Sequence, residues 1–144
     1  MTTVREILQI KGNTVWSVTP DSTVFDALVL MADKNIGALL VISGGNVLGI
    51  LSERDYARKV VLKGGSSREL HVREIMTSDP VSVRPEQSIE ECMEIMNSRH
   101  IRHLPVLENQ KLTGMITIRD VIKAVINEKE HTITQLESYI KGTQ

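Results

Sequence analysis

Two seven-residue segments of this chain carry the residue types that could bind a nucleotide. Gly49–Asp55 reads Gly-Ile-Leu-Ser-Glu-Arg-Asp and Gly114–Asp120 reads Gly-Met-Ile-Thr-Ile-Arg-Asp. If a helix begins just after each hydroxyl residue, its unpaired backbone N–H groups and the arginine would bind phosphate. The aspartate could accept hydrogen bonds from both hydroxyls of a ribose. We expect the glycine to keep the strand bare where a ligand approaches closely.

The same residues have a simpler interpretation as helix caps. Ser52 with Asp55, and Thr117 with Asp120, have the spacing of a capping box, in which hydroxyl and carboxylate only close the helix end. For a single isolated copy the cap is the better interpretation, because short motifs often match by chance. The cap explains neither the arginine before each aspartate nor the glycine before each hydroxyl. Because the whole pattern occurs twice, we favour a ligand.

Both segments lie in a longer internal repeat. Residues 17–60 align with residues 82–125 without a gap at an offset of 65. Such a repeat constrains the architecture before any single element is assigned. Each half alone would be marginal in size, so we expect the two halves to share a core.

Each repeat predicts a β-α-β-β-α unit. A capping box opens the first helix at Thr23–Asp26 and again at Ser88–Glu91. Two short apolar runs separated by a turn then predict a hairpin, and a second helix follows, over about 53–62 and about 118–129. Short extended pieces at 15–18 and 80–83 complete the units.

A shorter echo precedes each unit. Val4–Leu8 matches Val72–Met76 at an offset of 68, so the first half has three extra residues around Lys11–Asn13. Apolar residues at 133, 136, 139 and 140 could line one face of a last helix that packs on the body or meets a second subunit. We predict four segments: repeat 1 with its lead-in helix over 1–63, a linker over 64–71, repeat 2 over 72–129, and a C-terminal helix or tail over 130–144.

Composition argues against several classes of function. The 144 residues are 41% hydrophobic and 24% charged, as in ordinary globular proteins. A net charge of −1, with one Trp, two Tyr and one Phe, argues against nucleic-acid and membrane-surface binding. We find no apolar run long enough to span a membrane and no signal-peptide pattern. The single Cys92 cannot form an internal disulfide, so we expect a cytoplasmic protein.

Other reactive residue types predict neither a metal site nor catalysis. His100 and His103 lack the cysteine or carboxylate neighbours of a zinc site. Cys92 lies on an apolar helix face with Met93 and Met96, which indicates a buried thiol. We find no Ser-His-Asp order, no paired active-site acids and no Walker-type loop, so we predict no enzyme.

The paired units, their Gly-x-x-Ser/Thr-x-Arg-Asp endings and the Val-Arg-Glu-Ile lead-ins together resemble a tandem pair of CBS domains (cystathionine-β-synthase domains), a Bateman module of the stand-alone bacterial or archaeal type. The resemblance covers nearly the whole chain. It implies an α/β (α+β) fold in which two pseudo-twofold-related β-α-β-β-α repeats pack sheet to sheet, with two clefts between them. Such modules typically sense adenine-containing ligands, namely AMP, ADP or ATP, and in some members NAD or S-adenosylmethionine.

Matching positions imply the site residues. Asp55 and Asp120 would bind ribose. Phosphate would face Ser52, Arg54, Thr117 and Arg119. The base would be contacted in the Asp120 cleft by Val15, Trp16, Ile36, Gly37 and Ala38, and in the Asp55 cleft by Pro80, Val81, Ile101, Arg102 and His103. We expect the clefts to differ, because Gly37 and Ala38 leave room beside a base, whereas Arg102 and His103 fill that space or reach an additional phosphate.

We therefore predict a non-catalytic regulatory module that senses energy state or a metabolite through an adenine nucleotide. The alternative is a structural interaction module whose clefts hold no ligand. The resemblance also implies a homodimer and an effector protein that reads the bound state. We expect no metal site, and Mg²⁺ only together with a bound polyphosphate.

Overall fold

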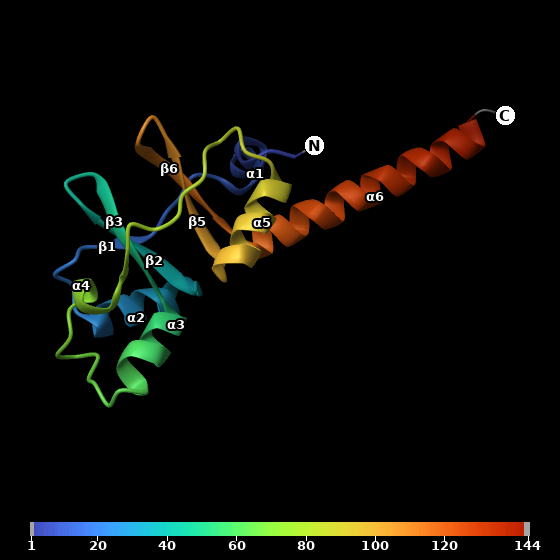
Figure 1. Cartoon of the computed structure of the whole chain (residues 1–144). Coiled ribbons are helices and arrows are strands. Elements are labelled where there is room, and N and C mark those ends of the chain that lie inside the picture. Colours follow the sequence, from blue (N-terminus) through green and yellow to red (C-terminus); the bar gives the residue numbers. More distant parts are fainter. Residues whose placement is uncertain (1, 143–144) are drawn as a thin grey trace.

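The computed structural model describes residues 2–142, which form two similar halves followed by a long helix (Figure 1). The helices and strands follow in the order α1 (Val4–Lys11), β1 (Ser17–Val18), α2 (Val24–Lys34), β2 (Ala38–Ser43), β3 (Asn46–Ser52), α3 (Glu53–Tyr56), the π-helical turn η1 (Ala57–Val61), α4 (Val72–Ile75), β4 (Thr77–Ser78), α5 (Ile89–Arg99), β5 (His103–Glu108), β6 (Lys111–Thr117) and α6 (Ile118–Gly142).

Each half is built on one antiparallel hairpin, and the two hairpins match in detail. Strands β2 and β3 pair with Ala38 opposite Ser52, and β5 and β6 pair with His103 opposite Thr117. Both ladders shift register at the equivalent place, directly after Val41 and directly after Val106. The predicted α+β architecture of two related units is confirmed.

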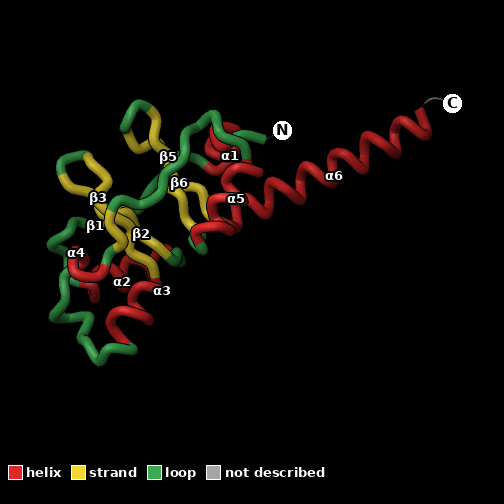
Figure 2. Tube along the Cα trace, in the orientation of Figure 1, coloured by secondary structure: helices red, strands yellow, loops and turns green. Residues whose placement is uncertain are grey.

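The edges of the two sheets differ. In the first half β1 pairs in parallel with β2, and β4 pairs antiparallel with β3, which gives four strands in the order β1-β2-β3-β4 (Figure 2). In the second half the extended piece predicted at 80–83 contributes one parallel bridge, from Val83 to Val106. The two sheets contact each other through β3 and β6.

The buried apolar residues form two clusters, so the prediction of one shared core is wrong. One cluster combines α2, β2 and β3 of the first half with Val72 and Ile75 of α4. The other combines α5, β5 and β6 of the second half with Val4, Ile7 and Leu8 of α1. Each core is therefore closed by the lead-in helix that precedes the other half.

Equivalent backbone hydrogen bonds hold the two exchanged helices. The N–H of Val4 donates to the carbonyl of Gln87 at 2.8 Å, and the N–H of Val72 donates to the carbonyl of Ser22 at 2.8 Å. The next residues, Arg5 and Arg73, donate to Pro85 at 2.9 Å and to Pro20 at 3.0 Å. These bonds satisfy first-turn N–H groups that have no partner within their own helix.

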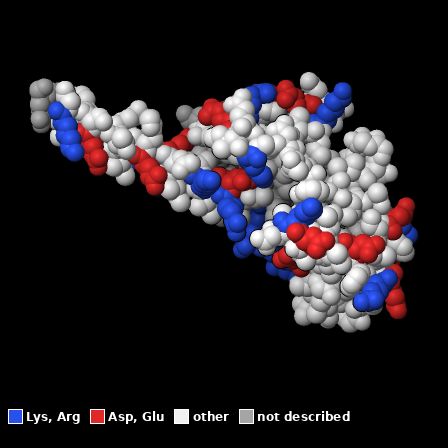
Figure 3. Space-filling view, turned by 180° about the vertical axis from the view of Figure 1, so that it is seen from behind, with Lys and Arg blue, Asp and Glu red and all other residues white. Residues whose placement is uncertain are grey.

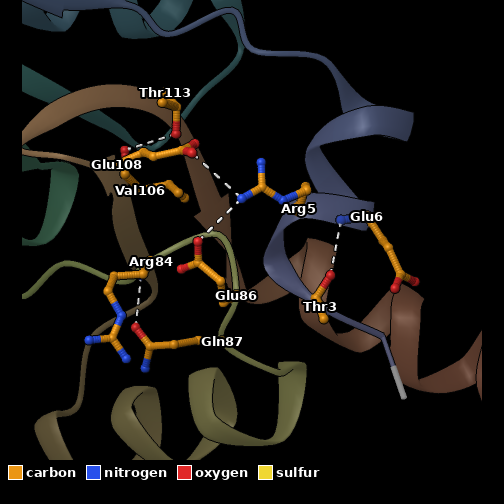
Figure 4. Close-up of polar contacts among 9 residues, drawn as sticks. All are labelled: Thr3, Arg5, Glu6, Arg84, Glu86, Gln87, Val106, Glu108 and Thr113. Atoms are coloured by element: carbon orange, nitrogen blue, oxygen red, sulfur yellow. Dashed lines mark hydrogen bonds and ion pairs between the residues drawn. The ribbon is translucent and has the colours of Figure 1, made fainter.

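Side chains add ion pairs at the same positions. Arg5 points between two carboxylates of the second half, with its Nη2 atom 3.3 Å from Glu86 Oε1 and 3.6 Å from Glu108 Oε1 (Figure 4). In the first half Arg73 pairs with Asp21, the counterpart of Glu86 in the repeat. The pairs are exposed and therefore add little stability.

The repeated glycines serve this exchange. A Cβ atom on Gly114 would lie 2.7 Å from Leu8 Cδ2, and one on Gly49 would lie 2.7 Å from Met76 Sδ and 2.8 Å from the Thr77 carbonyl oxygen. The space over each strand is thus filled by the other half's lead-in segment. The expectation that these glycines make room for a ligand is wrong.

The second helix of repeat 2 and the predicted tail form one helix. α6 runs for 25 residues from Ile118 to Gly142 and projects away from the body (Figure 1). Residues 143–144, which the predicted tail also included, lie outside the described residues. Within residues 2–142 no helix has the combination of length and apolar character needed to cross a membrane.

Alanine substitutions at the two glycines test the packing of the lead-in segments. Gly49→Ala places a methyl group against a backbone carbonyl, whereas Gly114→Ala places it against the flexible end of Leu8. We expect Gly49→Ala to lower the free energy of unfolding by about 1–3 kcal/mol, as overpacking does, and Gly114→Ala to lower it by less. Urea denaturation of both variants measures the difference. A neutral Gly49→Ala, or a larger loss in Gly114→Ala, would contradict this packing.

Candidate functional site

A cavity of about 510 Å³ lies between the two halves at the start of α6. The first half lines it with the residues predicted to contact a base, and the second half lines it with those predicted to bind ribose and phosphate. The predicted residues brought together here are Val15, Trp16, Ile36, Gly37, Ala38, Thr117, Arg119 and Asp120. The structure thus gathers all eight residues of the Asp120 cleft around one space.

The cap at the start of α6 supplies the polar end of this cavity. The backbone N–H and the hydroxyl of Thr117 donate to Asp120 Oδ2 at 2.8 Å and 3.0 Å. In return, the N–H of Asp120 donates to the Thr117 hydroxyl at 3.2 Å. The capping interpretation is therefore confirmed, and the same bonds hold the Asp120 carboxylate at the cavity wall.

Lys11 is a site residue that was not predicted from the sequence. As the last residue of α1, it reaches across from the exchanged helix and places its Nζ atom 2.7 Å from Asp120 Oδ2 and 2.8 Å from the Met115 carbonyl oxygen. The ammonium group thus forms an ion pair with the carboxylate that was predicted to bind ribose. The one signal in the sequence was the three-residue insertion around Lys11–Asn13, and the insertion alone does not say where the side chain goes.

The Asp55 segment has the same cap in different surroundings. The backbone N–H and hydroxyl of Ser52 donate to Asp55 Oδ2 at 3.0 Å and 3.1 Å. Asp55 Oδ1 lies 3.2 Å from Lys59 Nζ, one turn along the chain, and Arg54 donates to the carbonyl of His100 at 3.2 Å. Arg54 and Asp55 are therefore both engaged within the protein.

The base-contacting residues predicted for the Asp55 cleft are spread over several places. Arg102 and His103 line the Asp120 cavity. Ile101 and Arg102 also line a groove of about 780 Å³ between α5 and α6, which Arg54 reaches too. Val81 packs against the second core, and Pro80 is half-buried beside it.

The charges around the Asp120 cavity favour an anion. Lys11, Arg102 and Arg119 line it together with His103. Burial lowers the pKa of His103, and the positive charges of Lys11, Arg102 and Arg54 lower it further, against a smaller opposite effect of Asp120. The imidazole is therefore neutral at neutral pH. Lys11 pairs with Asp120, and among residues 2–142 no carboxylate lies within ion-pair distance of Arg102 or Arg119.

Trp16 gives the cavity an aromatic wall. Its side chain is 40% exposed, and Lys34 Nζ lies 4.2 Å from the ring centroid. Gly37 also lines the cavity and leaves open space there, since nothing lies within 4 Å of where its Cβ would be. A flat ring could enter beside Trp16 without displacing backbone.

Cys92 and His100, the other reactive side chains considered, lie in structural positions outside this cavity. Cys92 is buried in the second core, and burial, with Glu91 and Glu90 nearby, raises the pKa of its thiol to about 11. His100 ends α5 in the left-handed conformation at φ 55°. In the described part of the chain no group of three or more His, Cys, Asp or Glu side chains is placed to hold a metal ion.

Comparison with known proteins gives the same picture for both halves. Residues 2–62 and 72–127 each match the CBS domain family. The chain is 36% identical over 151 residues to the mitochondrial CBS domain-containing protein CBSX3 of Arabidopsis thaliana, covering 98% of this chain and 73% of that protein.

Solved structures agree. A candidate signal-transduction protein with CBS domains from Burkholderia ambifaria is 50% identical, with a TM-score of 0.85 over 88% of this chain and 95% of that one. The hexameric CBS-CP12 protein of bloom-forming cyanobacteria is 29% identical, with a TM-score of 0.75 over 84% of this chain and 70% of that one. The chain therefore belongs to the CBS domain family and carries two CBS domains in tandem.

Proposed function

We propose that this chain is a regulatory module that binds an adenine nucleotide in the Asp120 cleft and performs no chemistry itself. CBS-domain pairs form a family of regulatory modules that often bind adenosine ligands and are generally non-catalytic. The observation that supports the proposal here is the gathering of an aromatic wall, a capped helix start and three fixed cations around one cavity. Its volume lies in the usual range of small-molecule sites, roughly 300–1,000 Å³.

In this proposal each part of the nucleotide has a place. The ribose hydroxyls donate to Asp120, and the phosphate faces Thr117, Arg119 and the N–H groups at the start of α6. The base lies against Trp16 and beside Gly37, where the backbone leaves open space. Because the cap already holds Asp120 in position, the ligand does not have to order it.

The charges narrow the class of ligand. Lys11, Arg102 and Arg119 would stabilise phosphate and oppose the positive sulfonium of S-adenosylmethionine. We therefore propose a phosphorylated adenine ligand, with AMP as the first candidate, ADP, ATP and NAD as further ones, and Mg²⁺ present only with a polyphosphate. The Asp55 segment is the weaker site, because the carbonyl of His100 engages Arg54 and the residues predicted to contact the base are dispersed.

One observation favours a second function, that of a structural interaction module with ligand-free clefts. The carboxylates of Asp120 and Asp55 already have ammonium partners within the chain, in Lys11 and Lys59. Both aspartates are thus satisfied without a ligand. Saturable nucleotide binding decides between the two functions.

We further propose that the module acts in the cytoplasm as a homodimer whose bound state is read by an effector protein. A ligand shifts a conformational equilibrium only by its difference in affinity for the two states. The nucleotide contacts both halves and would therefore favour one arrangement of the halves. Oligomers occur in the family, since the CBS-CP12 protein is hexameric.

Trp16 makes a direct test of nucleotide binding possible, because it is the chain's one tryptophan and lines the cavity. We expect its fluorescence to change saturably with AMP, to lose this response in Asp120→Ala and to keep it in Asp55→Ala. The two variants are matched, since each removes the carboxylate of the same capping box and should cost on the order of 1 kcal/mol of stability. No saturable response to any adenine nucleotide would refute the proposal, and equal losses in both variants would refute the choice of cleft.

The ion pair between Lys11 and Asp120 predicts a preference for phosphorylated ligands. The ammonium competes with ribose for the carboxylate, and a phosphate in the cleft would stabilise it once displaced. We expect Lys11→Met to reduce the ratio of the affinities for AMP and adenosine several-fold, as measured by calorimetry. Adenosine should bind more tightly because its ribose no longer competes with the ammonium, and AMP should lose the ammonium's attraction for its phosphate.

Lys59→Met is the matched control for that experiment. Lys59 pairs with Asp55 and donates to the carbonyl of Ile75 at 2.9 Å, just as Lys11 pairs with Asp120 and donates to Met115. We expect the control to leave the ratio of the two affinities unchanged. The same ratio in Lys11→Met and in the unchanged protein would exclude a role for Lys11 in ligand choice.

A further inference from the structure

The C-terminal half of α6 has no packing within the described chain that accounts for its being a helix. Every residue from 129 to 142 is exposed, and the helix extends beyond the body (Figure 1). A helix of this length is marginal in water by itself, because most helical stability in proteins comes from packing an amphipathic face. The question is therefore which surface covers this face.

The apolar residues of α6 follow a heptad repeat. On the exposed side of α6, successive seam residues are alternately four and three positions apart. They are Ile122, Ile126, Lys129, Ile133, Leu136 and Ile140. Isoleucine thus occupies all three a positions (126, 133 and 140), and Ile122, Lys129 and Leu136 occupy the d positions. The apolar members are between 50% and 67% exposed. Such a stripe is the seam of a coiled coil.

This seam is separate from the side of α6 that packs on the body. Val121 is fully buried in the second core, and Ala124 and Val125 pack against that core. At 100° per residue, Val121 lies about 100° around the helix from Ile122 and Ile140. The N-terminal half of α6 therefore has two apolar sides, of which the fold covers one.

We propose that the seam pairs with the same seam of a second copy of this chain, as a parallel two-stranded coiled coil. The occupant must carry a matching heptad repeat, and α6 itself supplies one. The seam has isoleucine at every a position and leucine at one of its three d positions, Leu136, and isoleucine at a with leucine at d is the pattern of parallel two-stranded pairs. The seam is continuous with the groove between α5 and α6, since Ile122 and Ile126 belong to both. Pairing in parallel brings the two bodies together at this groove.

The charges beside the seam agree with parallel pairing. The flanking e positions hold Lys123, Glu130 and Glu137, and the g positions hold Val125, Thr132 and Tyr139. A parallel pair places e beside g of the other helix, so no two like charges meet there. Lys129 is the one charge in the seam. As a d residue it would face Lys129 of the second copy, just as the two copies of residue 136 face each other, and this charged layer would cost some of the stability of the pair. On the side seen in Figure 3, charged side chains lie at intervals along one edge of the projecting helix.

This proposal goes beyond nucleotide binding and does not depend on it, because the seam and the Asp120 cleft use different residues. It gives the proposed homodimer a specific interface, the seam of α6. A dimer formed through other faces of the repeats would not depend on the seam residues.

The test is the mass of the full-length chain in solution, measured by sedimentation equilibrium. We expect the unchanged protein to be a dimer and the double variant Ile133→Glu, Leu136→Glu to be a monomer. The control is Thr134→Glu, Ser138→Glu, which adds the same two charges on the opposite side of the helix and should remain a dimer. Both replaced seam residues are exposed and lie outside both cores, so any loss of helical circular dichroism should be no larger than the C-terminal half of α6 accounts for. An unchanged protein that is monomeric, or a seam variant as dimeric as the control, would overturn the proposal.

The orientation has its own test. In a parallel pair the two copies of residue 136 face each other, so Leu136→Cys should form a disulfide-linked dimer under mild oxidation. Cys92 is buried, and the unchanged protein under the same oxidation is the control. A seam-dependent dimer that fails to cross-link through position 136 would overturn the parallel arrangement.

Discussion

Each hydrophobic core of this molecule is completed by the lead-in helix of the other half, and most other features follow from that exchange. Leu8 of α1 lies directly over Gly114, and Met76, just after α4, lies over Gly49, so each hairpin is covered by the other half's lead-in. Neither half can keep its core if the other is removed. The exchange also brings the end of α1 to the start of α6, which is why Lys11 reaches Asp120.

The two repeated segments show how equal local structure can lead to unequal sites. Ser52 with Asp55 and Thr117 with Asp120 form the same cap with nearly the same distances. Their partners differ, because Asp55 pairs with Lys59 of its own helical region, whereas Asp120 pairs with Lys11 from across the molecule. At Asp120 a ligand would compete for the carboxylate with an ion pair between the halves, whereas the ion pair of Asp55 lies within one half. Binding there would therefore change how the halves are joined, as a sensor requires.

Much of the fold could be predicted from the internal repeat, and there are physical reasons why the rest of the fold and part of the site could not. Caps and hairpins depend on neighbouring residues, so Ser88–Glu91 and the apolar runs placed them correctly. Which core a lead-in helix joins depends on contacts with distant residues. The residues of Val4–Leu8 and Val72–Met76 are too similar to distinguish the two cores. The role of the glycines was misjudged for the same reason. The residues gathered around Asp120 were predicted from the family resemblance. The insertion around Lys11–Asn13 did not show that Lys11 contacts a distant segment.

Helix α6 links the two proposals, because its first turn borders the cavity and its exposed side carries the heptad seam. The central claim, a nucleotide in the Asp120 cleft, is tested most directly by mapping amide chemical shifts during a titration with AMP. We expect the changes to concentrate at Lys11, Gly37 and Asp120, with smaller ones at Ser52 and Asp55. Changes centred on the Asp55 segment, or none at saturating nucleotide, would contradict a nucleotide site at Asp120.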